Sequence, residues 1–394
     1  HSMLYLFHSL YRRFLILMYL KEIIEQDDIQ STLLHLVRKG TVPHALLFSG
    51  PEGTGKLPMA IAFARYLLCK NSADNDSCGT CPSCYKMNKL VHPDLHFLYP
   101  VINKSKSSQK PTRCDDEIKN WREIVTEKEY FNLEDWLISL GADNKQAQIF
   151  AAESDVITNK LSLKSTEGGY KIAIIWYPEK MHPACSNSLL KLLEEPPQKT
   201  VFILVSNNPD MILETITSRT QRIEFKRLQE NEISARLQQP PYSVDSTTAQ
   251  NISHICSGSW HKALQTLQIN EESQEYLNFF MQLMRLAYSR NVKEIKNLAE
   301  TLAAYGREWQ KRFLAYCQRM IRENFICNFH NPSLNYLTMQ EQNFSTKFAP
   351  FVNERNIIGL MEEFSLAQRH IEQNVNSRMV FFDLSLKLII LIKQ

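Results

Sequence analysis

Four cysteines lie close together in the first quarter of the chain and could hold a metal ion. Cys69, Cys78, Cys81 and Cys84 follow the spacing C-x8-C-x2-C-x2-C. Four thiolates with two short Cys-x2-Cys links are typical of a tetrahedral Zn²⁺ site with a structural role, because no coordination position stays open for chemistry. The spacing therefore favours structural zinc and disfavours catalysis by the metal.

Two other interpretations of these cysteines remain open. The run from Cys78 to Cys84 also matches the start of a bacterial iron–sulfur motif, but that motif needs a further Cys where the chain has Asn88. The four thiols could instead be free and buried. Clustering of this kind favours a reducing compartment over secreted disulfides. We expect the other cysteines to be core residues: Cys114, Cys185, Cys256, Cys317 and Cys327.

A glycine-rich loop precedes the cysteines and could bind phosphate. It reads G-x4-G-K from Gly50 to Lys56, between the apolar run ALLFS and the helical pattern LPMAIAFARYLL. In a phosphate-binding loop the glycines permit a tight turn whose backbone amides point at the phosphates, and the lysine supplies a positive charge. The residues expected to bind phosphate are Gly50, Gly53, Thr54, Gly55 and Lys56.

The residues that hydrolysis requires are missing from this site. The hydroxyl that holds Mg²⁺ should follow the lysine, but the chain has Leu57 there. A later buried strand should end in acidic residues, but it ends in Trp176 and Tyr177, and Glu179 lies beyond its end. Catalysis of phosphoryl transfer depends on positioning and charge neutralisation, so these losses together should abolish hydrolysis. Lys56 leaves open whether a nucleotide still binds.

Length and composition are those of an ordinary multidomain protein. The chain has 394 residues, 44% of them hydrophobic and 22% charged, and its net charge of +3 is too small to indicate nucleic-acid binding by itself. An apolar run near the start is interrupted by Arg12 and Arg13, which leaves pieces too short to span a bilayer. We expect residues 1–17 to be a dispensable extension, with a surface helix and a targeting element as alternatives.

Apolar runs alternate with helical patterns up to about Phe225. Strands are expected at Ala45–Ser49, Leu95–Val101, Lys171–Trp176 and Val201–Val205. Strands that alternate with helices imply a parallel sheet covered on both faces. The polar stretch 103–119 is expected to be an inserted surface loop.

Beyond Phe225 only helical periodicity remains. A small helical unit is expected at 227–270, and longer amphipathic helices from 271 to 394. The predicted domains are therefore 18–226, with the cysteine knuckle at 69–84 inside it, then 227–270 and 271–394. Two apolar stripes predict the core of the last domain: Trp309, Phe313, Cys317 and Met320, then Met379, Phe382, Leu386 and Ile389.

Several motifs together resemble the clamp-loader AAA+ ATPases. They are HALLFSGPEGTGK at 44–56, the cysteine knuckle, NSLLKLLEEPP at 187–197, FILVSNNP at 202–209 and ITSRTQRIEF at 216–225. The resemblance is dense from about Met18 to Phe225 and looser beyond. It implies an α/β AAA+ P-loop domain, with a parallel sheet flanked by helices, then a small helical lid and a C-terminal all-α collar domain through which subunits form a pentameric ring.

The resemblance also implies roles for individual residues. The family's Ser-Arg-Cys motif corresponds to Ser218-Arg219-Thr220, so Arg219 would be an arginine finger that reaches the ATP of a neighbouring subunit. Asn207 occupies a sensor position, and His261 stands where the lid's sensor arginine is expected. The resemblance further implies that the four cysteines of the knuckle bind Zn²⁺.

The predicted function follows from the resemblance and the missing catalytic groups. The chain would be a non-hydrolysing structural subunit of the bacterial DNA polymerase III clamp loader, cytoplasmic and not bound to a membrane. Implied partners are the clamp-loader ATPase subunits and a delta-type subunit in a heteropentamer, the sliding clamp, and primer–template DNA. Implied cofactors are structural Zn²⁺ and, without a productive Mg²⁺ site, ATP or ADP.

Two alternatives make different predictions. An active motor ATPase of the gamma/tau type would show Mg²⁺-dependent hydrolysis by the isolated chain. A zinc-dependent DNA-binding module would have a knuckle rich in lysine and arginine, whereas the segment NSADNDS between its first two cysteines has neither.

Overall fold

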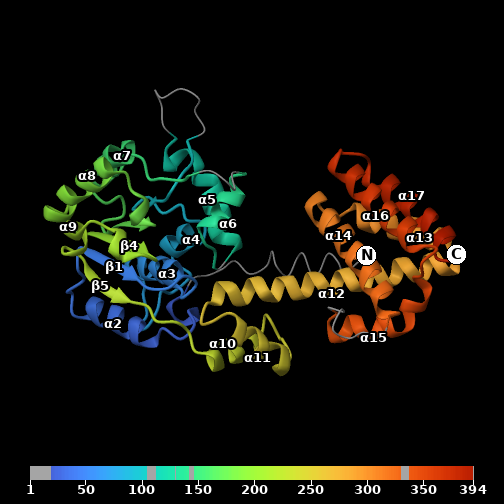
Figure 1. Ribbon diagram of the computed structural model, residues 1–394. Coiled ribbons are helices and arrows are strands. Elements are labelled where there is room, and N and C mark those ends of the chain that lie inside the picture. The colour runs from blue at the N-terminus through green and yellow to red at the C-terminus, as the bar shows by residue number, and fades with distance from the viewer. Residues whose placement is uncertain (1–18, 104–111, 129, 142–145, 330–336, 394) are drawn as a thin grey trace. The chain divides into compact units, whose positions relative to one another are not determined.

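The computed structural model describes residues 19–103, 112–128, 130–141, 146–329 and 337–393 (Figure 1). The predicted extension 1–17 therefore lies outside the described residues. The chain forms two compact units; the first ends at Thr266 and the second begins at Leu267, within helix α12 (Trp260–Ser289). No helix in the described ranges is long and apolar enough to cross a membrane.

The first unit contains a parallel five-stranded sheet with the strand order β2-β3-β4-β1-β5 (Figure 1). The four strands expected from the sequence are present, although β2 ends before the predicted Val101. The fifth strand was not predicted, because only one of its residues is buried. The strands are β1 (Ala45–Ser49), β2 (Leu95–Leu98), β3 (Lys171–Trp176), β4 (Thr200–Ser206) and β5 (Gln221–Glu224).

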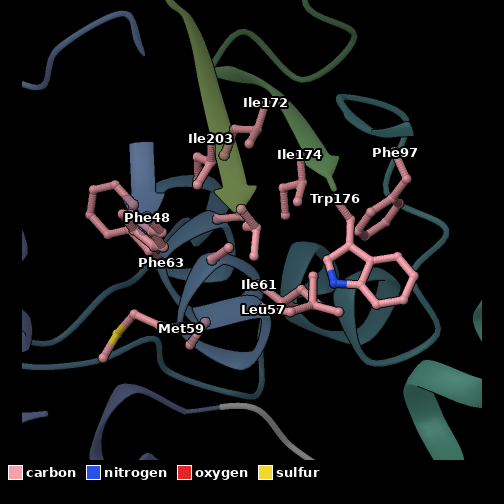
Figure 2. Close-up of a cluster of buried hydrophobic side chains, with 14 of the residues drawn as sticks. Phe48, Leu57, Met59, Ile61, Phe63, Phe97, Ile172, Ile174, Trp176 and Ile203 are labelled. Carbon is pink, nitrogen blue, oxygen red and sulfur yellow. The ribbon is translucent and has the colours of Figure 1, made fainter. Parts of the chain in front are cut away.

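Alternate residues of the inner strands enter two separate hydrophobic cores. Phe48 and Ile174 belong to one core, whereas their neighbours Leu47 and Ile175 belong to the other. Figure 2 shows side chains of the first core, including Phe48 of β1 and Ile174 of β3. Because both faces of the sheet are covered, these strands are continuously apolar rather than alternating, as expected for a buried parallel sheet.

Helices cover the sheet on both faces, which confirms the predicted α/β class. Helices α2 to α6 contribute residues to the core that contains Phe48, and helices α7 to α9 to the core that contains Leu47. The helices are α2 (Asp27–Arg38), α3 (Lys56–Leu68), α4 (Pro82–Asn88), α5 (Ile118–Glu127), α6 (Leu133–Ser139), α7 (Ala152–Ser162), α8 (Pro183–Glu194) and α9 (Glu214–Thr217).

The loop predicted at 103–119 is shorter than expected. Cys114–Glu117 form a 3₁₀ helix and α5 begins at Ile118, while residues 104–111 lie outside the described ranges. The backbone at Cys114 is fixed by two hydrogen bonds: its N–H donates to Glu153 Oε1 over 2.8 Å, and its carbonyl accepts from Tyr99 Oη over 2.6 Å. The acidic residues that suggested a loop occupy the first turn of a helix, where carboxylates are favourable.

The remaining elements are helical, as predicted. A small group consisting of α10 (Glu230–Gln238), α11 (Ser246–Ile255) and the start of α12 completes the first unit. The second unit is entirely helical where it is described, apart from its turns. Its further helices are α13 (Val292–Ala303), α14 (Arg307–Cys327), α15 (Met339–Phe348), α16 (Ile357–Glu372) and α17 (Ser377–Leu391).

The two apolar stripes predicted for the second unit, on α14 and α17, differ in how deeply they are buried. All four residues predicted on α14 are buried. On α17 the prediction fails at Met379, which is 69% exposed. Phe382 and Ile389 are half-buried and pack against the core, whereas the fully buried residues of this helix are Val380, Phe381, Leu384, Ser385 and Leu388. Apolar residues surround α17 on most sides, so periodicity alone could not identify the face that contacts α13 and α16.

Candidate functional site

The glycine-rich loop joins β1 to α3 at the carboxyl edge of the sheet. Gly50 has φ 144° and Gly53 φ 78°, values that L side chains rarely adopt. A Cβ at Gly50 would lie 2.2 Å from the carbonyl oxygen of Phe225, and one at Gly53 would lie 2.0 Å from Ser259 Oγ. Gly55 is left-handed and caps α3, which begins at Lys56. The sequence therefore folds into the turn that a phosphate-binding loop requires.

Lys56 is turned toward its own loop. Its ammonium donates to the carbonyl oxygens of Gly50, over 2.8 Å, and of Pro51. Burial lowers the pKa of Lys56 to about 8, although the carboxylates of Glu52 and Glu179 act in the opposite direction. Thr54 is buried as well, and its hydroxyl donates to Pro51 O over 2.9 Å. The side-chain groups of Lys56 and Thr54 thus already have partners within the loop.

Aromatic side chains occupy the space beside the loop. The cavity there has a volume of about 40 Å³, far below the roughly 300–1,000 Å³ of typical ligand pockets. Leu57 and Trp176 both line this cavity, and both are labelled in Figure 2. Trp176 lies at the end of β3, where a carboxylate was expected. The other aromatic residues that line the cavity are Tyr130, Phe131 and Tyr177.

A carboxylate of the loop itself is surrounded by polar groups. Glu52 Oε1 accepts from Asn132 Nδ2 over 3.0 Å, and Glu52 Oε2 accepts from Asn207 Nδ2 over 3.4 Å. Asn207 Nδ2 also donates to Tyr177 Oη over 2.8 Å. Asn207, the predicted sensor residue, therefore binds a carboxylate of its own chain. Because Glu52 is negative, it opposes the binding of phosphate at this place.

The start of α12 is bonded directly to the loop. The backbone N–H of Trp260 donates to Gly53 O over 2.9 Å. The next residue, His261, is buried and places Nε2 2.6 Å from Asp135 Oδ2 on α6, while its Nδ1 lies 4.0 Å from Glu52 Oε1. His261, at the predicted sensor position, thus joins the start of α12 to α6 through a carboxylate.

Glu179, which was not expected to act in the nucleotide site, contacts a residue that lines the cavity beside the loop. It belongs to a short 3₁₀ helix after β3, and its Oε1 accepts from the backbone N–H of Asn207 over 3.2 Å. It is not among the residues that line the cavity beside the loop.

Arg219 lies apart from the cavity, in the turn after α9. Its side chain is 37% exposed, with Nη2 2.7 Å from Glu194 Oε1 and Nη1 donating to Thr215 O over 2.8 Å. These contacts use two of the five N–H donors of a guanidinium. Arg219 is therefore held in one orientation and still has donors for another acceptor.

The four cysteines of the knuckle are brought together between α3 and α4. Cys69 follows the last residue of α3, and Cys81 caps the first turn of α4 by accepting from the N–H of Cys84 over 3.4 Å. Further backbone N–H groups point at sulfur: that of Cys78 donates to Cys69 Sγ over 3.3 Å, and that of Cys81 to Cys78 Sγ over 3.4 Å. Cys81 and Cys84 are buried, and Cys69 and Cys78 are half-buried.

The sulfur positions fit a single metal ion. Sγ–Sγ distances are 3.4 Å for Cys69–Cys78, 3.7 Å for Cys69–Cys84, 3.9 Å for Cys69–Cys81 and 4.0 Å for Cys78–Cys84. Four sulfurs arranged tetrahedrally at about 2.3 Å from one ion are about 3.8 Å apart. An iron–sulfur cluster, with several irons between the ligands, needs a wider set. The knuckle can therefore hold one metal ion, as the spacing of its cysteines predicted.

Sequence reasoning missed several residues of the loop region. Glu52, Asn132 and Asp135 were not singled out, although their carboxylates and amide meet beside the predicted phosphate loop. Only one of them carries a signal in the sequence: an acidic residue inside a phosphate-binding loop disfavours an anionic ligand. Asn132 and Asp135 lie about 80 residues away in an acidic helix cap, which has no distinctive pattern.

The amino-acid sequence is similar to several known proteins. DNA polymerase III subunit delta' of Bacillus subtilis is 30% identical over 212 residues, covering 54% of this chain and 51% of that protein. The delta' subunit of Escherichia coli is 29% identical over 176 residues, covering 45% of this chain and 40% of its own length. Subunit tau of Bacillus subtilis is 26% identical over 251 residues, covering 63% and 37%. The chain thus spans about half or less of the length of the curated relatives it matches.

Solved structures are more distant. The Bacillus subtilis clamp loader delta protein has 11% identity and a TM-score of 0.34, covering 93% of this chain and 100% of that one. Thermotoga maritima RuvB, the Holliday junction branch migration motor, has 12% identity and a TM-score of 0.37, covering 66% and 65%.

The family comparison agrees with the motifs. The family described as "DNA polymerase III, delta subunit" matches residues 25–229, which is just over half of the chain. This range contains the glycine-rich loop, the cysteine knuckle and Arg219, and it agrees with the resemblance to clamp-loader proteins. The chain therefore belongs to the DNA polymerase III delta-subunit family.

Proposed function

We propose that this chain is a non-hydrolysing structural subunit of a bacterial DNA polymerase III clamp loader. Its family membership and relatives named delta', tau and gamma/tau support this role. The proposed partners are clamp-loader ATPase subunits and a delta-type subunit in a heteropentamer, with the sliding clamp and primer–template DNA. DNA would be contacted by the assembled complex through its backbone phosphates, with the strong salt dependence that such contacts produce. The proposed location is the cytoplasm.

The observation that carries the proposal is the blocked phosphate loop. Bulky side chains reduce the adjoining cavity to about 40 Å³, and Glu52 brings a negative charge to the place of the phosphates. Leu57 and Trp176 leave no oxygen for Mg²⁺ at the two positions where the reaction needs one. The loop then serves as scaffold for α3 and the lid, and neither ATP nor ADP is required at this place.

Arg219 is the proposed functional residue of the chain. It would reach the ATP of a neighbouring subunit, where an arginine finger accelerates phosphoryl transfer by roughly 10³–10⁵. Support comes from its position outside its own loop's cavity and from its remaining N–H donors. A chain without hydrolysis of its own could control a neighbour in this way.

The four cysteines are proposed to hold Zn²⁺. Cys69, Cys78, Cys81 and Cys84 would form the four-thiolate set typical of structural zinc, and the ion would supply cross-linking energy to the knuckle. The residues 227–270 are proposed as a lid and 271–394 as the collar that joins the subunits of the ring.

The test is a reconstituted loader that contains the variant Arg219→Ala. We expect the clamp- and DNA-stimulated ATPase rate to fall, because one active site loses the charge that stabilises its transition state. Arg227→Ala, at another exposed arginine of the same unit, should leave the rate unchanged. An unchanged rate in Arg219→Ala would remove the proposed finger.

The competing motor function has its own signature. Mg²⁺-dependent ATP hydrolysis by the isolated chain, lost in Lys56→Ala, would contradict the non-hydrolysing role and favour a motor subunit.

A further inference from the structure

A buried arginine lies beside the cysteine knuckle and has no part in the proposed function. Arg65 belongs to α3, one turn before Cys69, and only 2% of the residue is exposed. Arginine is rarely buried to this extent unless its charge is compensated, because the transfer of an ion out of water costs several kcal/mol. Its Nε has no hydrogen-bond partner in the described part of the chain. The charge of Arg65 thus requires an explanation.

Tyr19 connects Arg65 to the knuckle. The guanidinium carbon lies 4.4 Å from the centre of the Tyr19 ring, and Nη2 is 3.4 Å from Tyr19 Oη. The same hydroxyl lies 2.0 Å from the place that a Cβ on Gly79 would occupy. Gly79 is the residue after Cys78, so the tyrosine ring covers the loop that carries the sulfurs. The stacked pair therefore places the guanidinium next to the metal-binding residues.

One sulfur of the knuckle lies in a dry environment. Cys84 is fully buried at the first turn of α4, where water cannot solvate a thiolate. A buried cation beside the knuckle, such as Arg65 stacked on Tyr19, would stabilise negative charge on such a sulfur.

With a metal ion bound, the knuckle would carry a negative charge, opposite to the positive charge of Arg65. One divalent ion with four thiolates carries a net charge of −2, and two of the four sulfurs belong to buried residues. The lysines next to the knuckle in the sequence are engaged elsewhere: Lys86 pairs with Glu167 Oε1, and Lys70 Nζ donates to Glu167 O over 2.7 Å. Arg65, by contrast, is buried beside the knuckle through its stacking on Tyr19.

We propose that Arg65 is the counter-cation of the metal–tetrathiolate centre and that Tyr19 holds it in place. This inference rests on the proposal that the four cysteines bind a metal ion. Groups outside the ligand shell tune metal affinity, and their removal commonly costs 10–100-fold. The alternative is a structural role, in which Arg65 only packs between α3 and Tyr19 and its charge does not influence the affinity for the metal.

The test measures the affinity of the full chain for Zn²⁺ by competition with a chromophoric chelator. Arg65→Met keeps much of the side chain's length but has no charge, and we expect it to bind Zn²⁺ 10–100-fold more weakly than the wild type. Arg65→Lys keeps the charge and should stay within about 5-fold of the wild type, which is less than the loss expected from removing the charge. Co²⁺-loaded protein gives a second measurement, since its sulfur-to-metal absorption bands report the thiolate set directly.

Arg38→Met is the matched control. Arg38 Nη2 donates to Asp74 O and Asn75 Oδ1 of the same knuckle over 2.7 Å each, but it does so from the exposed side. Its loss should change Zn²⁺ affinity less than 2-fold, because solvent screens an exposed charge. If Arg65→Met fails to fold, Arg65→Gln is the second neutral variant and carries the same expectation.

The outcomes separate this inference from the metal proposal. A wild-type chain that binds no Zn²⁺ would overturn both. A wild-type chain that binds Zn²⁺ tightly, together with neutral variants within 2-fold of it, would leave the metal site intact and overturn the role of Arg65. An equal loss in Arg65→Lys and Arg65→Met would also overturn it, because shape rather than charge would then be responsible.

Discussion

His261 Nε2 lies 2.6 Å from Asp135 Oδ2, and this contact joins the start of α12 to α6 across 126 residues of sequence. The carboxylate also accepts from Lys128 Nζ over 2.9 Å and from the backbone N–H of Asn132 over 3.1 Å. The imidazole is buried, at the position where the clamp-loader resemblance places a sensor arginine. A contact within the chain therefore connects the start of α12 to α6.

The first prediction concerns the pH dependence of this contact. Burial alone would raise the pKa of Asp135, but hydrogen bonds from His261, Lys128 and Asn132 outweigh it and hold the pKa well below its usual value. A carboxyl whose pKa is depressed by folding stabilises the folded state above its unfolded pKa of about 3.9, and this stabilisation is lost as the pH falls below that value. We expect Asp135→Asn to lower the free energy of unfolding by about 2 kcal/mol at pH 7.

Urea unfolding at pH 7 and at pH 3 measures this effect. The difference between Asp135→Asn and the wild type should shrink at pH 3, where part of the wild-type contribution is lost. Glu134→Gln is the matched control, because Glu134 is an exposed carboxylate on the same turn of α6 and should have little effect at either pH. A pH-independent difference would show that the carboxylate's charge is not responsible.

The second prediction concerns nucleotide binding. With a cavity of about 40 Å³ and Glu52 beside it, the isolated chain should bind Mg²⁺–ATP with a Kd above about 1 mM, which corresponds to less than about 4 kcal/mol of binding free energy. Titration calorimetry measures it. Lys56→Met should give the same weak result, because the lysine already bonds to its own loop. Micromolar binding by the wild type that disappears in Lys56→Met would contradict the prediction.

The third prediction concerns the orientation of Arg219. Glu194→Gln removes the charge that holds Nη2 and should reduce the clamp-stimulated ATPase rate of a reconstituted loader by about 2- to 10-fold, which is the effect of freeing one ordered side chain. Stability should change by less than about 0.5 kcal/mol, because both partners are exposed. Glu195→Gln, at the next residue, is the control and should leave the rate unchanged. A faster Glu194→Gln loader would mean that Glu194 sequesters the arginine.

The fourth prediction concerns metal removal. The chain should contain one metal ion, and a chelator should lower the free energy of unfolding by about 4 kcal/mol when the free metal had been about 1,000-fold above its Kd. Elemental analysis and thermal unfolding measure the two effects. Cys84→Ser should lose the ion, whereas Cys256→Ser, at a buried cysteine outside the knuckle, should retain it. Equal metal content in both variants would exclude the knuckle as the site.

Local patterns in the sequence were sufficient for part of the fold. The strand at 171–176 was predictable because a short apolar run between helical segments fits a buried strand, and Lys171–Trp176 form one. The stripe from Trp309 to Met320 was predictable because one face of α14 is apolar. On α17 apolar residues lie on most sides, so the choice between Met379 and Val380 depended on which neighbouring helices cover it.

Edge and loop elements were harder to predict. β5 has one buried residue, Ile223, and its place beside β1 depends on hydrogen bonds that no periodicity records. The helical turn at Cys114 has the polar composition of a loop, and hydrogen bonds with Glu153 and Tyr99 fix its backbone. Such contacts join residues about 15 and 39 positions apart in the chain.

The sequence by itself determined which chemical groups are available. It contains four thiols at metal-ligand spacing and a glycine loop with a lysine. It places Leu57 and Trp176 where a hydrolysing site needs a hydroxyl and a carboxylate. Spacing decides these features, because the ligands of a knuckle and the amides of a phosphate loop are neighbours along the chain. Only the tertiary structure decided what surrounds them. Glu52 meets Asn207, and His261 meets Asp135, because distant segments pack at the same edge of the sheet, and packing is not encoded in any local pattern.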